Sequence, residues 1–282
     1  MVSTLRRVES HHPGVGGVRL FRRAWLPERP RRTLLLVHGY AEHSGRYDEL
    51  AVWFASRGHA VHAYDQRGHG RSQGIRCHVR RFAEFLDDLG SVTESVREQH
   101  PALPLFLVGH SMGGLITLAF LAERQPRVAG AVVSGPALAV DAVSPLRVAL
   151  AKVLGRLAPR LPLGAGLDPQ GLSRDPEVVR RYLEDPLVVR TMTASLGARM
   201  LDAARRTAAQ AAQIHVPLLI VHGEEDPLCA PRGSQEFYAG VHSPGSTLRL
   251  YSGLRHEIFN EPEREQVYRD LLQWLDGVPG EA

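Results

Sequence analysis

The chain of 282 residues contains little cysteine, and this scarcity excludes two classes of protein. Its two cysteines, Cys77 and Cys229, lie far apart and form no Cys-x-x-Cys pair. Such a pattern does not build a disulfide framework, and the cysteine and histidine spacing typical of a structural zinc site is missing. The sequence therefore predicts a fold held together by its core, with no bound metal.

Long apolar runs are also missing. No stretch approaches the ~18–20 uncharged apolar residues that cross a bilayer. The arginines near the N-terminus are not followed by the apolar segment of a secretory signal. Hydrophobic residues make up 44% and charged residues 23%, which is typical of a globular protein with a sizeable core. We therefore expect a cytoplasmic protein.

Lysine is almost absent, so arginine carries nearly all of the positive charge. Lys152 is the only lysine, and the formal net charge is +4. Positive and negative residues are interspersed, and the tightest basic run, Arg29–Arg32, has no interleaved aromatic residues. A nucleic-acid-binding surface usually has clustered basic residues with aromatic residues among them, and this sequence shows neither, so no nucleic-acid partner is expected.

What the sequence does contain is a repeated alternation of short apolar runs with helical patterns, and five of the six runs end in glycine. This alternation predicts an α/β fold with a mostly parallel sheet covered by helices on both faces. Ligands of such sheets bind outside the carboxyl ends of the strands. The expected strands are Thr33–Gly39, His59–Asp65, Pro104–Gly109, Val128–Gly135, Val216–Gly223 and Thr247–Gly253, and the expected helices are Arg81–Glu98, Met112–Arg124, Gln235–Val241 and Glu263–Leu275.

Residues 136–215 interrupt the alternation and predict an inserted helical cap between the two parts of the core, 1–135 and 216–282. The segment Pro145–Ala158 reads as a helix with an apolar face and basic residues beside it. That face either packs over the pocket, which we favour slightly, or touches a membrane or micelle surface. Its residues are Leu146, Leu150, Val153, Leu154 and Leu157, and the basic residues are Arg147, Lys152 and Arg156.

Ser111 stands in Gly109-His110-Ser111-Met112-Gly113, which fits the pattern G-x-S-x-G. The pattern alone is weak, but here an expected strand precedes it and an expected helix follows. A serine on such a sharp turn has a strained backbone, and side chains two positions away would collide with the strand and the helix. Glycines remove the collision. Ser111 is therefore the candidate nucleophile.

A serine nucleophile needs a base, and the base needs a carboxylate to orient it. On this fold their order along the chain is serine, acid, histidine. His256 follows the last expected strand and precedes the last helix, where the base should lie. Asp226 follows the fifth strand and precedes a proline, which favours a turn that aims the side chain. Glu225 is the runner-up for the acid.

Two backbone N–H groups should stabilise the oxyanion that forms on the substrate. One comes from Met112, the residue after the nucleophile, at the start of a helix. The other is expected from Tyr40, in the loop after the strand Thr33–Gly39. His38, in the same segment, reads as a structural histidine.

Five stretches carry a resemblance: HGYAEHSGRYDELA, YDQRGHGRSQG, GHSMGG, HGEEDPLC and RHEIFNEP. Together they resemble the monoacylglycerol lipase and lysophospholipase branch of the α/β-hydrolase superfamily, and the similarity runs from about Leu34 to Trp274. The stretch SRDPEVVRRYLEDPL extends it into the cap.

The resemblance implies hydrolysis of a fatty-acid monoester of glycerol by Ser111, Asp226 and His256, without metal or organic cofactor. It also implies that Glu42, Arg46 and Tyr182 line the polar end of the pocket and recognise hydroxyls. The chain departs from the family's pattern at Tyr40, where a small residue is frequent, and at Phe259, where animal members carry a second histidine.

Other functions remain open at this stage. The same three residues can serve a lysophospholipase, a general carboxylesterase, or an acyltransferase in which an alcohol or peroxide replaces water. A non-catalytic ligand-binding relative would not need them all. The expected partner is a small lipid ester, with transient membrane contact through the cap and no protein partner.

Overall fold

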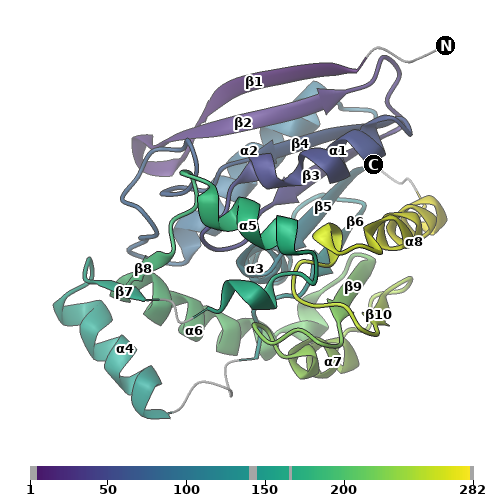
Figure 1. Cartoon of the computed structure of the whole chain (residues 1–282). Coiled ribbons are helices and arrows are strands. Elements are labelled where there is room, and N and C mark those ends of the chain that lie inside the picture. The colour runs from purple at the N-terminus through teal and green to yellow at the C-terminus, as the bar shows by residue number, and fades with distance from the viewer. Residues whose placement is uncertain (1–4, 140–144, 165–166, 280–282) are drawn as a thin grey trace.

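The computed structural model describes residues 5–139, 145–164 and 167–279, and its centre is a twisted sheet of eight strands (Figure 1). The strand order is β1-β2-β4-β3-β5-β6-β9-β10. All neighbours from β4 to β10 run parallel, whereas β2 is antiparallel to both β4 and β1. The strands are β1 (Arg6–Pro13), β2 (Arg19–Leu26), β3 (Arg32–Val37), β4 (His59–Tyr64), β5 (Leu105–His110), β6 (Gly130–Ser134), β9 (Leu218–Gly223) and β10 (Thr247–Tyr251).

Helices cover both faces of the sheet, as the alternating pattern predicts. One apolar cluster joins the sheet to α2 (Ala83–Gln99), α3 (Met112–Arg124) and α6 (Ala194–Ala208), and a second joins it to α1 (Asp48–Ala55) and α8 (Arg264–Gly277). The helix α7 (Pro231–Ala239) lies beside β9 and β10. The central strands β3, β4, β5, β6 and β9 are buried on both faces, which is why they read as continuous apolar runs. The α/β-hydrolase fold is confirmed.

All six expected strands and all four expected helices are present, with ends shifted by a few residues. The sequence analysis missed the hairpin of β1 and β2 at the sheet edge. Its sequence has arginines among apolar residues, and β1 is largely exposed, so the pattern carries no continuous apolar run. The edge position explains the polarity, because one side of the hairpin faces water.

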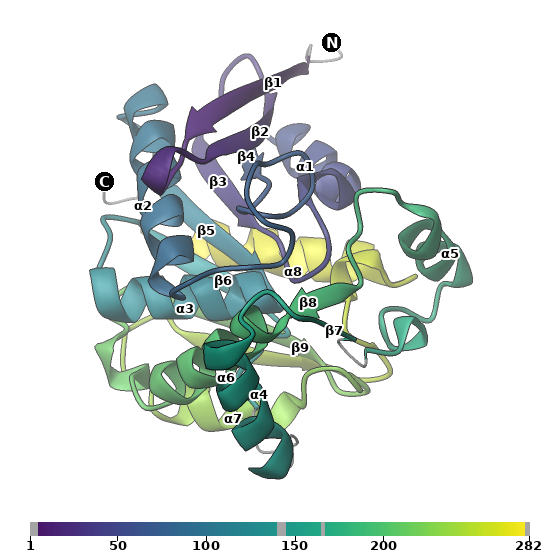
Figure 2. The ribbon, with the colours of Figure 1, turned by 90° about the vertical axis from the view of Figure 1, so that its left-hand side faces the viewer.

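Between β6 and β9 lie elements that the alternation did not resolve. They are α4 (Pro145–Leu157), β7 (Pro162–Gly164), α5 (Pro176–Glu184), β8 (Thr191–Thr193) and α6. β7 and β8 form a small antiparallel pair, and α4 packs on α6 at the edge of the molecule (Figure 2). Each of α5 and α6 begins at a side chain, Asp175 or Thr193, that accepts a backbone N–H of the first turn.

The helix α4 matches the expected segment, but one of the two expectations for its apolar face is wrong. Leu150, Val153 and Leu157 are 54%, 50% and 81% exposed, so they do not pack over a pocket. The helix contacts α6 through the opposite side, where Gly155 lies against Ala198. The side chains of Leu146 and Arg147 lie outside the described residues. Within the described ranges, no helix is long and apolar enough to cross a membrane.

Candidate active site

Ser111 occupies a strained turn between β5 and α3. Its backbone has φ 54° and ψ −117°, a region that L-residues rarely adopt. A Cβ on Gly113 would lie 2.0 Å from the carbonyl oxygen of Val37, and one on Gly109 would lie 2.4 Å from Oγ1 of Thr117. Both glycines are therefore required for the close approach of strand, helix and turn, as the sequence predicts.

His256 and Asp226 meet at the carboxyl ends of β10 and β9. Nδ1 of His256 lies 2.7 Å from Oδ2 of Asp226, and both side chains are buried. Glu225, the runner-up, is exposed, so Asp226 is the carboxylate that reaches the histidine. Asp226 holds its place because Oδ1 also accepts the backbone N–H groups of Leu228 and Cys229, at 2.8 and 2.9 Å.

A further histidine contacts the same carboxylate, and the sequence analysis did not single it out. Nε2 of His222, on β9, lies 3.0 Å from Oδ2 of Asp226. Burial alone would raise the pKa of Asp226, but the charge of His256 and hydrogen bonds from His222, His256 and the backbone lower it below its usual range. Asp226 is therefore ionised at neutral pH. The signal for His222 is its position four residues before Asp226, at the end of a buried strand.

The three residues Ser111, Asp226 and His256 are gathered around Gly135. The Ser111 N–H donates to the carbonyl of Ser134 at 2.9 Å, and a Cβ on Gly135 would lie 3.3 Å from Nδ1 of His256. Burial disfavours the charged form of His256, yet the neighbouring Asp226 carboxylate outweighs it and raises the pKa of His256. A histidine so placed can accept the proton of a serine hydroxyl and hold the resulting charge beside a carboxylate.

Because the pKa of His256 is raised, the activity should depend on pH in a definite way. The groups that face the ring are Asp226, Glu257 and Glu42, whose charges raise the pKa, and the buried His110, whose ring centroid lies 4.7 Å away. His256 accepts a proton only when it is neutral, so activity falls as the pH drops through the pKa. We expect the acidic limb of kcat/KM to lie above the ordinary histidine value of about 6.5. Initial rates on a soluble ester from pH 5 to 9 measure it, and a limb below pH 6 would contradict this assignment.

The loop after β3 lies directly against Ser111. A Cβ on Gly39 would come within 3.1 Å of Cβ of Ser111, which places the neighbouring Tyr40 at the nucleophile. Among the described residues, the backbone N–H groups of Tyr40 and Met112 have no hydrogen-bond acceptor. Met112 begins α3, so the positive end of the helix dipole points to the same place. His38 fixes the loop, because its Nε2 accepts the N–H of Gln66 at 2.9 Å.

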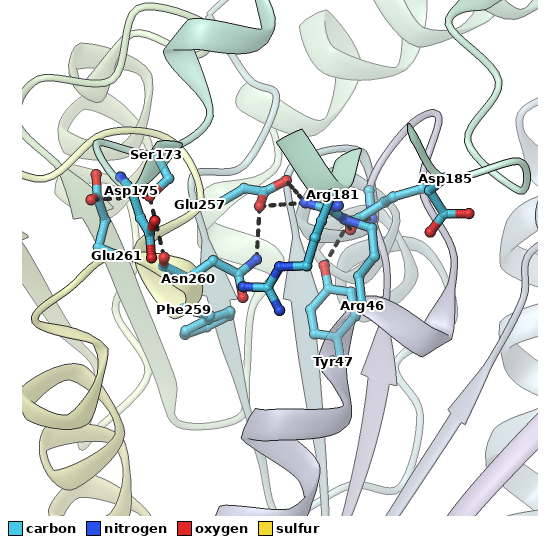
Figure 3. A network of polar contacts seen from close by, with 12 residues as sticks. Arg46, Tyr47, Ser173, Asp175, Arg181, Asp185, Glu257, Phe259, Asn260 and Glu261 are labelled. Atoms are coloured by element: carbon cyan, nitrogen blue, oxygen red, sulfur yellow. Dashed lines mark hydrogen bonds and ion pairs between the residues drawn. The ribbon is translucent and has the colours of Figure 1, made fainter. Parts of the chain in front are cut away.

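A buried ionic cluster is hydrogen-bonded to this loop. Oε1 of Glu42 accepts the Gly39 N–H at 2.5 Å and the Tyr47 hydroxyl at 2.7 Å, and Oε2 lies 3.3 Å from Nε of Arg46. Arg46 also donates from Nη2 to both carboxylate oxygens of Glu257, at 2.7 and 2.6 Å (Figure 3). Glu257 directly follows His256, so one guanidinium links the loop to the histidine segment.

The cluster contains two carboxyl groups and one guanidinium. Burial raises the pKa of Glu42, and the charge of Glu257 raises it further. Burial also opposes ionisation of Glu257, but the Arg46 charge outweighs it and lowers the pKa of Glu257. Asn260 adds a hydrogen bond to Glu257 at 2.7 Å. Glu42 and Arg46 are predicted from the sequence, whereas Glu257 and Asn260 are not, although these two lie in the RHEIFNEP stretch.

Tyr182, on α5 between β6 and β9, lies against this cluster. The Arg46 guanidinium carbon lies 5.0 Å from the centre of the Tyr182 ring. Tyr182 and Tyr40 line a cavity of about 150 Å³, together with Leu172 and Arg190. Glu42 and Arg46 are not among its lining residues. The end of α5 is also joined to the loop by His43, whose Nε2 lies 2.8 Å from Oδ2 of Asp185.

Two further features bear on the chemistry. In the described part of the chain, no group of three or more His, Cys, Asp or Glu side chains is arranged to hold a metal ion. Cys229 lies beside Ser111, and burial, with the charge of Asp226, raises the pKa of its thiol while a hydrogen bond with Ser111 lowers it. Burial dominates, so the thiol stays protonated and unreactive.

Comparison with known proteins agrees with this geometry. The family described as serine aminopeptidase, S33, matches residues 28–263. A monoacylglycerol lipase of Mycolicibacterium smegmatis is 43% identical over 98% of this chain and 99% of its own, and the human monoglyceride lipase is 35% identical over 94% and 89%. The crystal structure of a Paleococcus ferrophilus monoacylglycerol lipase has a TM-score of 0.82 and 35% identity, covering 98% of this chain and all of its own. The chain therefore belongs to the serine aminopeptidase, S33, family and, within the α/β-hydrolase superfamily, to its monoacylglycerol lipase branch.

Proposed function

We propose that the protein hydrolyses monoacylglycerols to fatty acid and glycerol through an acyl-enzyme on Ser111. The observation that carries the proposal is the pairing of His256 with Asp226 at 2.7 Å beside a serine held at φ 54°. Strain of this kind persists only where the surrounding structure imposes it, and it exposes the hydroxyl at the carboxyl edge of the sheet.

Each group has a defined role in the reaction. His256 takes the proton of the Ser111 hydroxyl as the oxygen attacks the ester carbonyl, and the N–H groups of Tyr40 and Met112 stabilise the oxyanion. The tetrahedral intermediate collapses, the ester C–O bond breaks, and His256 gives its proton to the departing glycerol oxygen. Water then attacks the acyl-enzyme with His256 as base, which releases the fatty acid and restores Ser111.

The substrate is recognised at the contact between loop and cap. Of the three residues expected to meet the glycerol, only Tyr182 lines the cavity beside Tyr40. We infer that Tyr182 contacts the substrate hydroxyls, whereas Glu42 and Arg46 act by holding the loop that carries the Tyr40 N–H. The cavity of about 150 Å³ is smaller than the roughly 300–1,000 Å³ of ordinary ligand pockets. We propose residues 136–215 as the cap of this site, and a long acyl chain needs more room than this cavity provides.

A hydrolysis profile of the purified protein tests the substrate. It compares monoacylglycerols of increasing chain length with a lysophospholipid, a triacylglycerol, a short nitrophenyl ester and an aminoacyl nitroanilide. Preference for long-chain monoacylglycerol supports the proposal. Activity confined to the short ester would retain the serine chemistry and contradict the lipase function, and Tyr40 and Phe259 would then account for the altered site. Preference for the nitroanilide would indicate a peptidase instead.

The exposed face of α4 supports a second part of the proposal, contact with a lipid surface. Leu150, Val153 and Leu157 project together from the cap edge. The C-terminal part of the same helix borders a cavity of about 460 Å³ that is lined by four arginines with no carboxylate partner among the described residues: Arg80, Arg156, Arg160 and Arg199. Apolar side chains next to positive charge are the features of a segment that rests on an anionic bilayer.

We therefore expect the protein to co-sediment with vesicles containing phosphatidylglycerol. Replacing Leu150, Val153 and Leu157 with serine should weaken that binding by about tenfold or more, because an apolar side chain gains about 1.5–3 kcal/mol on full burial. Hydrolysis of a soluble short ester should not change. The control is Leu183→Ser on α5, which is 40% exposed and lies outside this face. If the triple-serine variant and Leu183→Ser bound the vesicles equally well, the apolar face of α4 would have no part in vesicle binding.

A further inference from the structure

Asp226 is contacted by two histidines, and only one of them is needed as a base. His222 stands at the carboxyl end of β9 with its side chain fully buried. Its Nε2 lies 3.0 Å from Oδ2 of Asp226 and 2.8 Å from the carbonyl oxygen of Cys229. Its Nδ1 lies 2.7 Å from Oγ of Ser234, a fully buried residue on α7.

These partners determine where the hydrogens lie. The carboxylate and the carbonyl that face Nε2 are both acceptors, so Nε2 must carry a hydrogen and donate it. The Ser234 hydroxyl, which can donate or accept, then donates to Nδ1. The imidazole of His222 is thereby fixed in one tautomer and one ring orientation by groups from β9, α7 and the loop after β9.

These contacts also occupy the hydrogen-bond acceptor sites of the Asp226 carboxylate. Oδ1 accepts two backbone N–H groups, and Oδ2 accepts from His222 and from His256. A carboxylate offers about four lone-pair sites, so each is occupied. Because His222 and His256 share Oδ2, the donor on His222 competes with His256 for the charge of that oxygen.

We propose that His222 is a positioning residue for the catalytic pair. It donates from Nε2 to Oδ2 of Asp226, fixes the plane of that carboxylate toward His256, and limits how strongly Oδ2 attracts the proton on Nδ1 of His256. Ser234 holds His222 in the donating tautomer. The inference rests on the proposed function, since it assigns a role relative to His256 as the base.

Removal of the donor has a direction that can be measured. With leucine at position 222, one lone pair of Oδ2 is bare in a buried site, and the oxygen becomes more basic. The proton shared with Nδ1 of His256 is then drawn toward Asp226, and its low-field proton NMR resonance should move further downfield. The carboxylate also loses a constraint on its plane, so kcat on a short nitrophenyl ester should fall by about tenfold or more with KM little changed.

The experiment compares His222→Leu with four further variants at one pH. His222→Gln retains an amide donor and should restore most of the resonance position and of kcat. Ser234→Ala, which removes the partner of Nδ1, should give a smaller downfield shift. His62→Leu is the matched control, because His62 is also a buried histidine on a strand, β4, and pairs with His100 away from the site. The resonance is identified by its loss in His256→Gln.

An unmoved or upfield resonance in His222→Leu, or the same shift in His62→Leu, would overturn the proposal. If His222→Leu does not fold, Ser234→Ala and His222→Gln decide instead, and an unchanged resonance in Ser234→Ala is the contradicting result. The NMR readout needs no substrate. A protein that cleaves no ester would refute the proposed function, while the effect of His222 on the Asp226–His256 proton would still be measured.

Discussion

Replacing Ser111 with alanine should lower ester turnover by about 10⁶-fold and leave the fold intact. Loss of the nucleophile from a Ser-His-Asp enzyme has an effect of this size, because the remaining groups no longer act as a unit. The turn at Ser111 is held by backbone hydrogen bonds that alanine retains: its N–H donates to the carbonyl of Ser134, and its carbonyl accepts from the N–H groups of Leu115 and Ala137. Steady-state rates measure the loss of turnover, and the thermal unfolding midpoint measures whether the fold is intact.

A second substitution at the same position separates chemistry from strain. Glycine adopts φ 54° without strain, whereas serine and alanine adopt it only at a cost in free energy. Ser111→Gly should therefore be as inactive as Ser111→Ala but more stable than it by about 1–2 kcal/mol, the cost of holding an L-residue in this region. The difference in free energy of unfolding between the two variants, from urea titration, measures the strain of the turn without the hydroxyl.

The control for both variants is Ser243→Ala. Ser243 is a buried serine whose hydroxyl lies 2.7 Å from that of Ser246, outside the candidate site. It should retain full activity. Turnover by Ser111→Ala above the uncatalysed rate by more than about 10⁴-fold would show that another group attacks the ester, since oxyanion stabilisation and binding alone leave about 10³–10⁴.

The sequence predicts the frame of this site because each of its parts has a local signature. Ser111 and Asp226 each follow a central strand that is apolar on both faces, and His256 follows the partly buried outer strand β10, so their meeting at one edge follows from a parallel sheet. The glycines beside Ser111 are likewise needed for a reason visible in sequence, the collision that a Cβ would cause.

The residues that the sequence did not reveal act through contacts between distant segments. Glu257 reaches Arg46 from 211 positions away, and nothing in the local pattern of either residue indicates the pair. His222 reads as part of an apolar strand, and only the turn after β9 brings Asp226 back to it. The exposed face of α4 was misjudged for a related reason, because the helical period shows that apolar residues share a face but not what that face contacts.

Replacing Arg46 with methionine should destabilise the protein by about 3–5 kcal/mol at neutral pH, with a fall of about 10 °C in the unfolding midpoint. The Arg46 side chain is only 8% exposed and is the cation that faces both Glu42 and Glu257. Methionine fills much of the volume but leaves two buried carboxyl groups without a positive charge. Arg124→Met is the control, because its ion pair with Asp87 at 2.8 Å is partly exposed and should contribute at most about 1 kcal/mol.

The pH dependence of this loss has a definite sign. In the native protein Arg46 lowers the pKa of Glu257, so Glu257 contributes stability above the unfolded carboxyl pKa, and that contribution is lost as the pH falls through the lower folded value. In Arg46→Met, burial without a cation raises the pKa of both carboxyls, and the variant loses stability as the pH rises. The difference in free energy of unfolding between the two proteins should therefore widen from about pH 4 to pH 7.

A double variant decides whether charge or packing causes the effect. Arg46→Met with Glu257→Gln removes one of the stranded carboxylates and should recover part of the lost stability, giving a coupling free energy well above the ~0.5 kcal/mol expected of independent sites. Additive losses, or a loss for Arg46→Met that is flat with pH, would mean that the cluster acts only by packing. Because Glu42 accepts the Gly39 N–H, the single variant should also be less active than native at temperatures where both are folded. A loop that keeps its place without Arg46 would show native kcat there, and the ionic cluster would then have no part in positioning the Tyr40 N–H.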